Sequence, residues 1–489
     1  MKKTLKILHV AAELSPMLST GGLAEVVNAL PKALRAAGHD VRVAIPCYRS
    51  IPAALQGERV AACEVAVGPK RITGALRESR IPGTDVPVYL IEHEGYFGRE
   101  HPYGQEDGEY GDNAERYCFF GLALLEAMRH IGWKPDVINC HDWHTAPIVI
   151  YLKTNLAASP FWAGTPTVYT IHNLNFQGRF AAHQLPFTGF DPSLFHMECL
   201  EYFGDINLMK GAIVSADKLN TVSPRYAREI QTMEYGAGLD GVLRKRRDDL
   251  CGILNGIDYE VWNPACDPYI AAPFGRDNLR GKAACKSDLQ DAFQLPRQNA
   301  PVFGVVSRLT WQKGIDLIID ALDLIPDKSF QVALLGTGDS PIENRLINAA
   351  QRYPGKVTVI LRYDTALAHK VMAGSDFFLM PSRYEPCGLS QLYSLAYGTV
   401  PVVRRTGGLA DSVRNLSRVN GRKTQATGLS FVPMTSQALL RAMHKALDLY
   451  ASPAALESLR ITGMSEDFSW ARASREYVAL YREALAKAG

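Results

Sequence analysis

Residues 6–34 read KILHVAAELSPMLSTGGLAEVVNALPKAL and contain an apolar run, a loop with two glycines and an amphipathic helical pattern. The apolar residues of that pattern recur at i, i+3/i+4 and i+7, the spacing of a helix that buries one face. They are Leu23, Val26, Val27, Leu30 and Leu34. Residues 302–322, VFGVVSRLTWQKGIDLIIDAL, repeat this order of strand, loop and helix. Each half of the chain therefore begins like a Rossmann-like domain.

Short β-branched runs alternate with helical patterns along most of the chain. We expect strands at residues 6–12, 40–46, 86–92, 136–140, 167–172, 218–222, 252–255, 302–307, 331–336, 356–361, 376–380 and 400–404. Continuous apolar strands separated by helices indicate parallel sheets that are covered on both faces. The predicted fold class is α/β, with two Rossmann-like, doubly wound parallel-sheet domains facing a deep cleft. Residues at the carboxyl ends of the strands are expected to line that cleft.

The predicted domain boundary lies where the alternation of strands and helices is interrupted. Residues 263–300 have no strand pattern and are rich in proline, aspartate and arginine. We therefore predict an N-terminal domain of residues 1–262, a linker region of residues 263–300 and a second domain of residues 301–467. The length of 489 residues allows two large domains or three ordinary ones, and the position of the interruption favours two.

Composition and charge indicate a folded protein that binds neither nucleic acid nor a membrane. The 53 Lys and Arg residues against 50 Asp and Glu residues give a net charge of +3, without a clustered basic stripe. We interpret the basic run at residues 244–247 as a solvated helix end, with a contact to an anionic ligand as the alternative. No apolar run approaches the ~20 residues of a membrane span. Nine dispersed cysteines without a C-x-x-C pair favour the reducing cytoplasm.

Two loops with similar wording precede helices in the two halves. They are Ser19-Thr20-Gly21-Gly22-Leu23-Ala24-Glu25 and Thr406-Gly407-Gly408-Leu409-Ala410-Asp411. Backbone N–H groups at such positions favour an anion such as a diphosphate. An ordinary tight turn is the alternative for each loop alone, but the recurrence at two strand-to-helix junctions favours binding. Walker A, G-x-S-x-G and H-E-x-x-H motifs are absent from the sequence.

Polar residues also end two neighbouring strands of the first half, in His141-Asp142-Trp143-His144 and Thr170-Ile171-His172-Asn173. A zinc site is disfavoured, because no third ligand stands at a suitable spacing. We interpret His172 as a neutral hydrogen-bonding group or general acid/base, with a structural histidine as the alternative. Asp142 is placed to orient a hydroxyl group.

In the second half, cations and a carboxylate follow strands. Arg308 and Lys313 lie on the loop after the first strand, where two cations suit a diphosphate, with two solvated surface charges as the alternative. Glu385 lies in Pro381-Ser382-Arg383-Tyr384-Glu385-Pro386-Cys387-Gly388-Leu389, between a strand end and a glycine-led helix, where it can contact a sugar. Cys387 is expected to pack rather than to act as a nucleophile, because nothing nearby lowers its pKa.

In combination, these segments resemble the bacterial glycogen synthase and plant starch synthase family over nearly the whole chain. The specific motifs are Ser-Arg-Leu-x-x-Gln-Lys-Gly, Pro-Ser-Arg-Tyr-Glu-Pro-Cys-Gly-Leu and Tyr-Thr-Ile-His-Asn. The resemblance implies the GT-B fold and a retaining hexosyltransferase that moves glucose from ADP-glucose to the non-reducing 4-OH of an α-1,4-glucan such as glycogen. It also implies an acceptor side in the N-terminal domain, a donor side in the second domain, and a final helix, residues 468–489, that packs back on the N-terminal domain.

The resemblance assigns roles to single residues. Arg308 and Lys313 would neutralise the donor diphosphate, with backbone N–H groups of Gly407 and Gly408. Glu385 would hold the donor glucose and stabilise positive charge at its anomeric carbon, while His172 would contact the glucose 6-OH. Asp142 matches the acceptor side, Asn255 reaches the sugar, and Tyr363 would stack on the adenine. The remaining residues expected at the donor are Ser19, Gly21, Gly22, Cys387, Gly388, Leu389 and Thr406.

The chain departs from the family wording in two places. The family motif is usually Lys-Thr-Gly-Gly-Leu or Lys-Val-Gly-Gly-Leu followed by Asp, whereas here Ser19 replaces the lysine and Glu25 replaces the aspartate. Arg362 and Thr365 differ from the common Gly-Tyr-Asp-Glu wording. The expected reaction is a front-face displacement that needs neither a metal nor another cofactor. Rival hypotheses are a related GT-B enzyme that uses UDP-glucose or a maltosyl phosphate, and a catalytically weak glucan-binding paralogue.

Overall fold

The computed structural model describes residues 4–105, 108–325, 329–416, 418–419, 422–423 and 425–488. The chain folds into two compact units. Unit 1 comprises Met1–Val222, Ala227–Gly256 and Trp470–Gly489, and unit 2 comprises Ser223–Tyr226 and Ile257–Ser469. Residues 263–300, which we expected to form a linker region, therefore lie within unit 2, where they include helix α8 (Gly281–Ala292).

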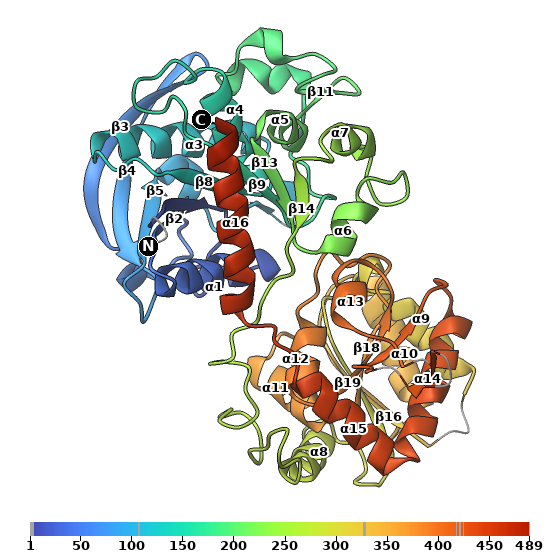
Figure 1. Ribbon diagram of the computed structural model, residues 1–489. Coiled ribbons are helices and arrows are strands. Elements are labelled where there is room, and N and C mark those ends of the chain that lie inside the picture. The colour runs from blue at the N-terminus through green and yellow to red at the C-terminus, as the bar shows by residue number, and fades with distance from the viewer. Residues whose placement is uncertain are drawn as a thin grey trace. The chain divides into compact units, whose positions relative to one another are not determined.

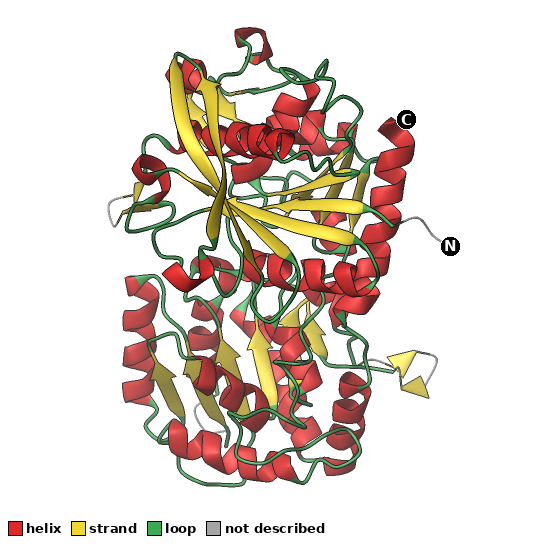
Figure 2. Ribbon diagram, turned by 90° about the vertical axis from the view of Figure 1, so that its left-hand side faces the viewer, coloured by secondary structure: helices red, strands yellow, loops and turns green. Residues whose placement is uncertain are grey.

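Unit 1 is built on a nine-stranded sheet in the order β14-β13-β9-β8-β1-β2-β5-β4-β3, whose strands fan out in Figure 2. The strands from β14 to β5 pair in parallel. Their bounds are β1 Lys6–Val10, β2 Asp40–Pro46, β5 Pro87–Glu92, β8 Val137–His141, β9 Thr167–Ile171, β13 Lys218–Thr221 and β14 Leu250–Gly252. The last strand was expected at residues 252–255 and is earlier in the chain.

An antiparallel hairpin extends this sheet and was not predicted. It consists of β3 (Glu58–Val67) and β4 (Lys70–Arg80), and β4 pairs with β5 in antiparallel orientation. The second half of β3 alternates between buried and exposed residues, as expected of a strand with one solvated face. The search for continuous apolar runs missed that pattern, so the expectation of a wholly parallel sheet is wrong for this edge.

The C-terminal helix α16 (Trp470–Ala488) belongs to unit 1, although unit 2 precedes it in the chain. In Figure 1 it is the red helix beside the blue and green elements of that unit, and it packs against α1 (Gly22–Ala36). Tyr477, Leu480 and Tyr481 of α16 share one buried cluster with Ile7 of β1 and Leu30 of α1. Helix α16 therefore completes the hydrophobic core that β1 and α1 also line.

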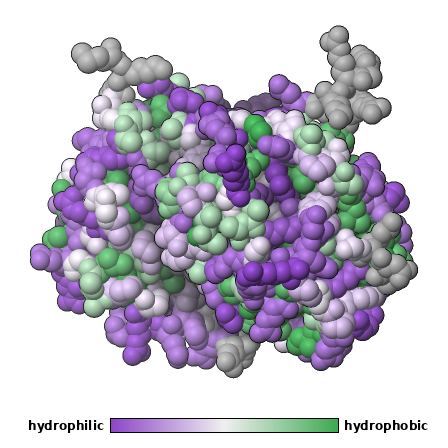
Figure 3. Space-filling view, turned by 90° about the horizontal axis from the view of Figure 1, so that it is seen from below, coloured by the Kyte–Doolittle hydropathy of each residue, from purple (hydrophilic) through white to green (hydrophobic). Residues whose placement is uncertain are grey.

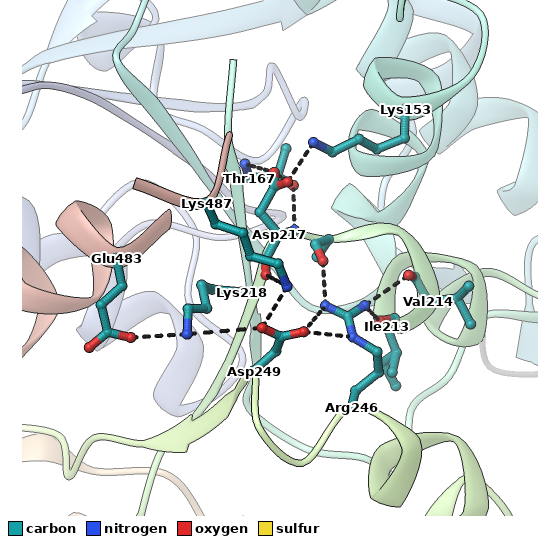
Figure 4. A network of polar contacts seen from close by, with 11 residues as sticks. Lys153, Thr167, Ile213, Val214, Asp217, Lys218, Arg246, Asp249, Glu483 and Lys487 are labelled. Atoms are coloured by element: carbon teal, nitrogen blue, oxygen red, sulfur yellow. Dashed lines mark hydrogen bonds and ion pairs between the residues drawn. The ribbon is translucent and has the colours of Figure 1, made fainter. Parts of the chain in front are cut away.

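An ion-pair network fastens the far end of α16 to the sheet (Figure 4). Lys487 donates to the carboxylate of Asp249 at 2.6 Å, and Lys218 pairs with Glu483 at 3.0 Å. Arg246 also donates to Asp249 and to the last carbonyl oxygens of α5 (Leu208–Ser215).

Arg246 of this network belongs to the basic run at residues 244–247, which we interpreted as a solvated helix end. Arg244 and Lys245 pair with Asp240 and Glu198, and Arg247 lies 3.6 Å from Asp248. Arg246 differs from the expected solvated charge, because it is partly buried and caps α5. The side chains of Arg244, Lys245 and Arg247 are more than half exposed, as expected of a solvated helix end, whereas Arg246 serves the fold of unit 1.

Unit 2 contains a six-stranded parallel sheet in the order β17-β16-β15-β18-β19-β22. The strands are β15 Val302–Val306, β16 Gln331–Leu335, β17 Val357–Ile360, β18 Phe377–Met380, β19 Val400–Arg404 and β22 Leu429–Phe431. Counted from β15, this is the 3-2-1-4-5-6 order of a Rossmann sheet. Helices cover both faces: α9 (Ile315–Asp323), α10 (Ser340–Arg352) and α14 (Ser436–Tyr450) on one, α8 and α11 (Thr365–Gly374) on the other.

The parallel strands of unit 1 follow the same order, with β1 at the centre, β2 and β5 on one side, and β8, β9, β13 and β14 on the other. The prediction of an α/β fold with two doubly wound sheets is confirmed. On the face shown in Figure 3, hydrophilic and apolar residues are interspersed. Within the described ranges, no helix combines the length and apolar character that crossing a membrane requires.

Candidate functional site

The candidate residues of unit 1 follow β1, β8 and β9, which are neighbouring parallel strands. The strand order reverses between β1 and β8, and α/β sheets bind ligands at such a switch point. The loop after β1 leads to Gly21 and Gly22. Asp142 directly follows β8, and His172 directly follows β9. The structure thus brings residues that are far apart in the chain to one edge of the sheet.

Glu13 holds the loop between β1 and α1, a role that sequence reasoning missed. Its Oε2 accepts from the Thr20 N–H at 2.7 Å, and its Oε1 accepts from the hydroxyl groups of Thr20 and Tyr103 at 2.6 Å each. The fixed loop leaves Ser19 and Gly21 exposed, and a Cβ on Gly21 would meet nothing within 4 Å. A ligand can therefore approach the backbone here. The available signal was an acidic residue directly after an apolar strand.

Asp142 combines an unusual backbone with a buried carboxyl group. Its φ of 57° and ψ of −179° are rare for a residue other than glycine, and such strain concentrates at functional sites. Its Oδ1 accepts from the His172 N–H at 2.7 Å. Burial raises the pKa of Asp142 to about 7, against the opposing effect of the backbone N–H groups of His172 and Asn173. Near neutral pH this carboxyl group can accept a hydrogen bond from a hydroxyl group or donate one.

His172 lies at the end of a row of three histidine rings. Its Nε2 is 2.9 Å from Nδ1 of His141, and Nε2 of His141 is 3.0 Å from Nδ1 of His9. Burial lowers the pKa of His172 and of His9 to about 3, and the pKa of His141 well below its usual range. All three rings are therefore neutral at physiological pH. Nδ1 of His172 has no hydrogen-bond partner within the part of the chain that the structure describes.

Asn255 follows β14, and its side chain is buried with 5% exposure. Its Oδ1 has no hydrogen-bond partner among the described residues. A Cβ on Gly256 would lie 2.7 Å from the backbone nitrogen of Trp470, so the chain passes close to the start of α16 at this point. An unpaired buried oxygen is costly unless water or a ligand bonds to it. The predicted contact of Asn255 with the sugar stays a prediction.

In unit 2, Glu385 lies at the switch point between β15 and β18. Its Oε2 accepts from Lys313 Nζ at 2.7 Å and from Ser382 Oγ at 2.9 Å. The side chain of Glu385 is 6% exposed and that of Lys313 is 17% exposed. Glu385 Oε1 has no hydrogen bond to any described residue, so it can accept one from a ligand. Sequence reasoning predicted Glu385 and Lys313 but missed Ser382, which orients the carboxylate.

Arg308 and Tyr363 are exposed at the carboxyl ends of β15 and β17. The guanidinium group of Arg308 makes no hydrogen bond or ion pair with a described residue, so a ligand can use it. Tyr363 is 85% exposed, and its ring is accessible for stacking. The neighbouring Arg362 pairs with Asp364 at 3.1 Å. A bound ligand would restrict the exposed side chains of Arg308 and Tyr363.

The turn before α13 (Gly407–Ser412) corrects one expectation. The N–H of Gly408 donates to the carbonyl oxygens of Glu385 at 3.1 Å and Pro386 at 3.2 Å. The prediction that Gly408 offers its N–H to a diphosphate is therefore wrong, because that donor is already used. A Cβ on Gly407 would lie 1.9 Å from the Glu385 carbonyl oxygen, and one on Gly408 would lie 2.0 Å from that of Cys387. The glycines let this turn pack against the segment that carries Glu385.

The remaining predicted residues of unit 2 surround that segment. Thr406 and Cys387 are buried, and Gly388 has a φ of +72° before α12 (Ser390–Ala396), whose N-cap is Leu389. Gln391 donates to the carbonyl oxygens of Cys387 and Gly388, which fixes their backbone. Over the described ranges, no group of three or more His, Cys, Asp or Glu side chains is arranged to hold a metal ion.

Family models match both units. Residues 6–245 match the starch synthase catalytic domain, and residues 287–458 match the glycosyl transferases group 1. The chain is 45% identical to a glycogen synthase of Geotalea daltonii, over 99% of this chain and 100% of that protein. It is 43% identical to a glycogen synthase of Moorella thermoacetica, over 100% of this chain and 98% of that protein.

Solved structures agree. The catalytic domain of starch synthase IV from Arabidopsis thaliana, bound to ADP and acarbose, superposes with a TM-score of 0.90 and 32% identity, covering 99% of this chain and 100% of that chain. A sucrose-phosphate synthase from Thermosynechococcus elongatus, at 18% identity and a TM-score of 0.59 over 98% of this chain and 99% of that chain, shares the fold alone. The chain belongs to the family of bacterial glycogen synthases and plant starch synthases, which are glycosyltransferases with the GT-B fold.

Proposed function

We propose that this chain transfers glucose from ADP-glucose to the non-reducing 4-OH end of an α-1,4-glucan, with retention of the anomeric configuration. The observation that carries the proposal is Glu385, held by Lys313 and Ser382 at the switch point of unit 2. The unpaired Arg308 lies on the same loop as Lys313. A carboxylate for a sugar and cations for a diphosphate are what a nucleotide-sugar donor requires.

The cations of unit 2 serve the leaving group in this proposal. Negative charge grows on the diphosphate as the glycosidic bond breaks, and cations that are already in place stabilise it without reorganisation. Arg308 supplies a planar guanidinium group that can form two parallel hydrogen bonds to phosphate oxygens. Lys313 is held by Glu385, so its ammonium group is fixed before the donor binds. The adenine stacks on the exposed ring of Tyr363.

Glu385 serves the sugar. Its Oε2 is committed to Lys313 and Ser382, which makes the carboxylate a poor nucleophile, while Oε1 stays available to the sugar. Retaining hydrolases use two carboxyl groups about 5–5.5 Å apart, one of them as nucleophile. Because Glu385 is held by Lys313 and Ser382 and is a poor nucleophile, we propose a front-face displacement through an oxocarbenium-like state, without a covalent intermediate. Unit 2 takes the nucleotide, while Asp142 and His172 of unit 1 contact hydroxyl groups of the sugar and of the acceptor.

The relatives support the substrate class, because the Arabidopsis starch synthase IV structure contains ADP and acarbose. We place the reaction in the reducing cytoplasm, since all nine cysteines are free thiols in the structure.

A donor panel tests the proposal. Purified protein with glycogen is given ADP-glucose, UDP-glucose or maltose 1-phosphate, with and without EDTA, and release of the leaving group and growth of α-1,4-linked product are measured. ADP-glucose should give the highest kcat/KM, and EDTA should leave it unchanged. A preference for either other donor would overturn the donor assignment. Glycogen binding without turnover of any donor would identify a catalytically weak paralogue instead.

A further inference from the structure

The row of histidines in unit 1 continues into the C-terminal helix. Beyond His9, its Nε2 lies 3.4 Å from the hydroxyl group of Tyr481 on α16, and Tyr481 accepts from Asn139 Nδ2 at 2.9 Å. We call Asn139, Tyr481, His9, His141 and His172 the histidine chain. Asn139, Tyr481, His9 and His141 are each 0% exposed, and His172 alone is partly accessible. The histidine chain thus runs from the fully buried amide group of Asn139 to His172, a candidate substrate-binding residue.

Asn139 sets the direction at the buried end. Its Oδ1 accepts from the Thr170 hydroxyl group at 2.9 Å, so its NH₂ group faces Tyr481. Thr170 in turn is 3.5 Å from the NH₂ group of Asn220. An amide nitrogen can only donate, so the Tyr481 oxygen accepts, and its own proton has His9 Nε2 as acceptor. The amide orientation therefore makes Tyr481 a donor toward the histidines.

The tautomer of each ring then follows from the network. A neutral imidazole has one N–H and one acceptor nitrogen. If His9 Nε2 accepts from Tyr481, the His9 proton is on Nδ1 and is donated to His141 Nε2. His141 then carries its proton on Nδ1 and donates to His172 Nε2. The proton of His172 is consequently on Nδ1, the nitrogen without a partner among the described residues.

We propose that Asn139, Tyr481, His9 and His141 are positioning residues that hold His172 in its Nδ1–H tautomer, so that His172 presents a hydrogen-bond donor to a sugar hydroxyl group. The inference rests on the proposed function only for the identity of that hydroxyl group, the glucose 6-OH. The hydrogen bond made by one ring nitrogen sets the protonation of the other. The C-terminal helix thereby contributes to the substrate-binding surface of unit 1 through one buried hydroxyl group.

Burial keeps the histidine chain in the required form. The low pKa values of His9 and His172 keep those rings neutral, and burial raises the pKa of Tyr481 well above its usual range, so its proton stays on. A second proton would turn a ring into an imidazolium ion, which donates from both nitrogens. The hydrogen bonds of the histidine chain would then no longer all point in one direction.

The first test needs no substrate. Long-range ¹H–¹⁵N NMR of protein labelled at histidine ring nitrogens distinguishes the two neutral tautomers, and a His172→Asn variant assigns the His172 signals. We expect His9, His141 and His172 to be Nδ1–H tautomers in the free protein. An Nε2–H tautomer at His172 would overturn the inference, whatever donor the protein uses. This measurement separates failure of the inference from failure of the proposed function.

The second test removes the donor at the buried end. Tyr481→Phe should convert the His172 signal to a mixture of tautomers and lower kcat/KM for ADP-glucose by about three- to tenfold. Tyr151→Phe is the matched control, because Tyr151 is also fully buried in unit 1 and donates to the Thr188 carbonyl oxygen, outside the network of Asn139, Thr170 and Asn220. The control should stay within about twofold of the unchanged protein. Equal losses in both variants would contradict the inference.

A third variant reverses the histidine chain. In Asn139→Asp, studied at a pH at which the new carboxyl group is ionised, the carboxylate can only accept, so Tyr481 donates to it and every histidine proton moves to Nε2. His172 Nδ1 then becomes an acceptor, and the loss with ADP-glucose should exceed that of Tyr481→Phe. With ADP-6-deoxyglucose, which lacks the hydroxyl group, Tyr481→Phe and the unchanged protein should be equally active. A loss of the same size with both donors would show a purely structural role.

Discussion

The two units share a strand order and differ in the chemistry at its switch point. In unit 2 the residues after the strands include charged groups, the ion pair of Lys313 with Glu385 and the exposed Arg308. In unit 1 the corresponding positions hold Asp142, with a pKa near neutrality, and the neutral His172. The same scaffold therefore presents an ion pair and an exposed cation in one unit, and a partly ionised carboxyl group and a neutral imidazole in the other.

In the proposed function, the two sets of groups serve different parts of the substrates. A diphosphate needs cations, whereas sugar hydroxyl groups need donors and acceptors of defined direction. A neutral histidine chain supplies direction without charge, at the cost of burying several polar rings in the core of unit 1.

The largest effect is expected on stability in acid. Burial lowers the pKa of His9, His144 and His172 to about 3 and lowers that of His141 well below its usual range, all in unit 1. The unfolded chain binds these protons near pH 6.5 and the folded unit does not, so their stabilisation is complete above that pH and is lost as the pH falls toward 3. Each histidine contributes about 1.4 kcal/mol per pH unit in this window.

Asp142 opposes this trend, because its raised pKa favours the folded state at lower pH, but it is one group against four. In unit 2, burial lowers the pKa of one lysine side chain, Lys282, which is again one group against the four histidines of unit 1. Hydrogen exchange at pH 7 and pH 5, corrected for intrinsic rates, should show unit 1 losing several kcal/mol more protection than unit 2. Equal losses in the two units would break the comparison.

The next effect concerns catalysis in unit 2. Glu385→Ala should lower kcat by ~100-fold, or ~2.7 kcal/mol, because the carboxylate acts on the sugar as positive charge develops. ADP affinity should change little. Steady-state kinetics and calorimetric titration with ADP measure the two quantities. A variant that loses ADP binding to the same extent as turnover would show that Glu385 serves the nucleotide.

The sequence predicted much of this arrangement and missed what depends on long-range contacts. Strands at residues 40–46 and 400–404 were predicted at their observed bounds, because continuous apolar runs with turn residues at both ends are strong local signals. The partnership of Asn139 with Tyr481 joins residues 342 positions apart, and no local pattern reveals it.

The glycine turn shows the same limit at short range. Its wording predicted a backbone open to an anion, yet the N–H of Gly408 bonds the Glu385 carbonyl oxygen, and only the fold places those two groups together. His9 was visible as a polar residue within an apolar strand. The role proposed for His9 depends on its contacts with His141 and Tyr481, which no local pattern predicts.

A smaller effect is expected at position 19. Ser19 is exposed on a loop that Glu13 fixes through Thr20, so a lysine there would add a cation without disturbing the fold. Ser19→Lys should raise kcat/KM for ADP-glucose by about tenfold, or ~1.4 kcal/mol, with little change in Tm. This variant would place a permanent positive charge at the same edge of the sheet as Asp142 and His172, the candidate residues of unit 1 that carry none. An unchanged or lower kcat/KM with an unchanged Tm would show that unit 1 needs no cation.

The division of tasks between the units is tested most directly by ADP affinity in two variants. Calorimetric titration should show that Arg308→Ala weakens ADP binding by about tenfold or more, because one of the cations proposed to bind the diphosphate is lost. His172→Ala should bind ADP within about twofold of the unchanged protein while losing turnover. Equal weakening in both variants, or none in Arg308→Ala, would contradict the account.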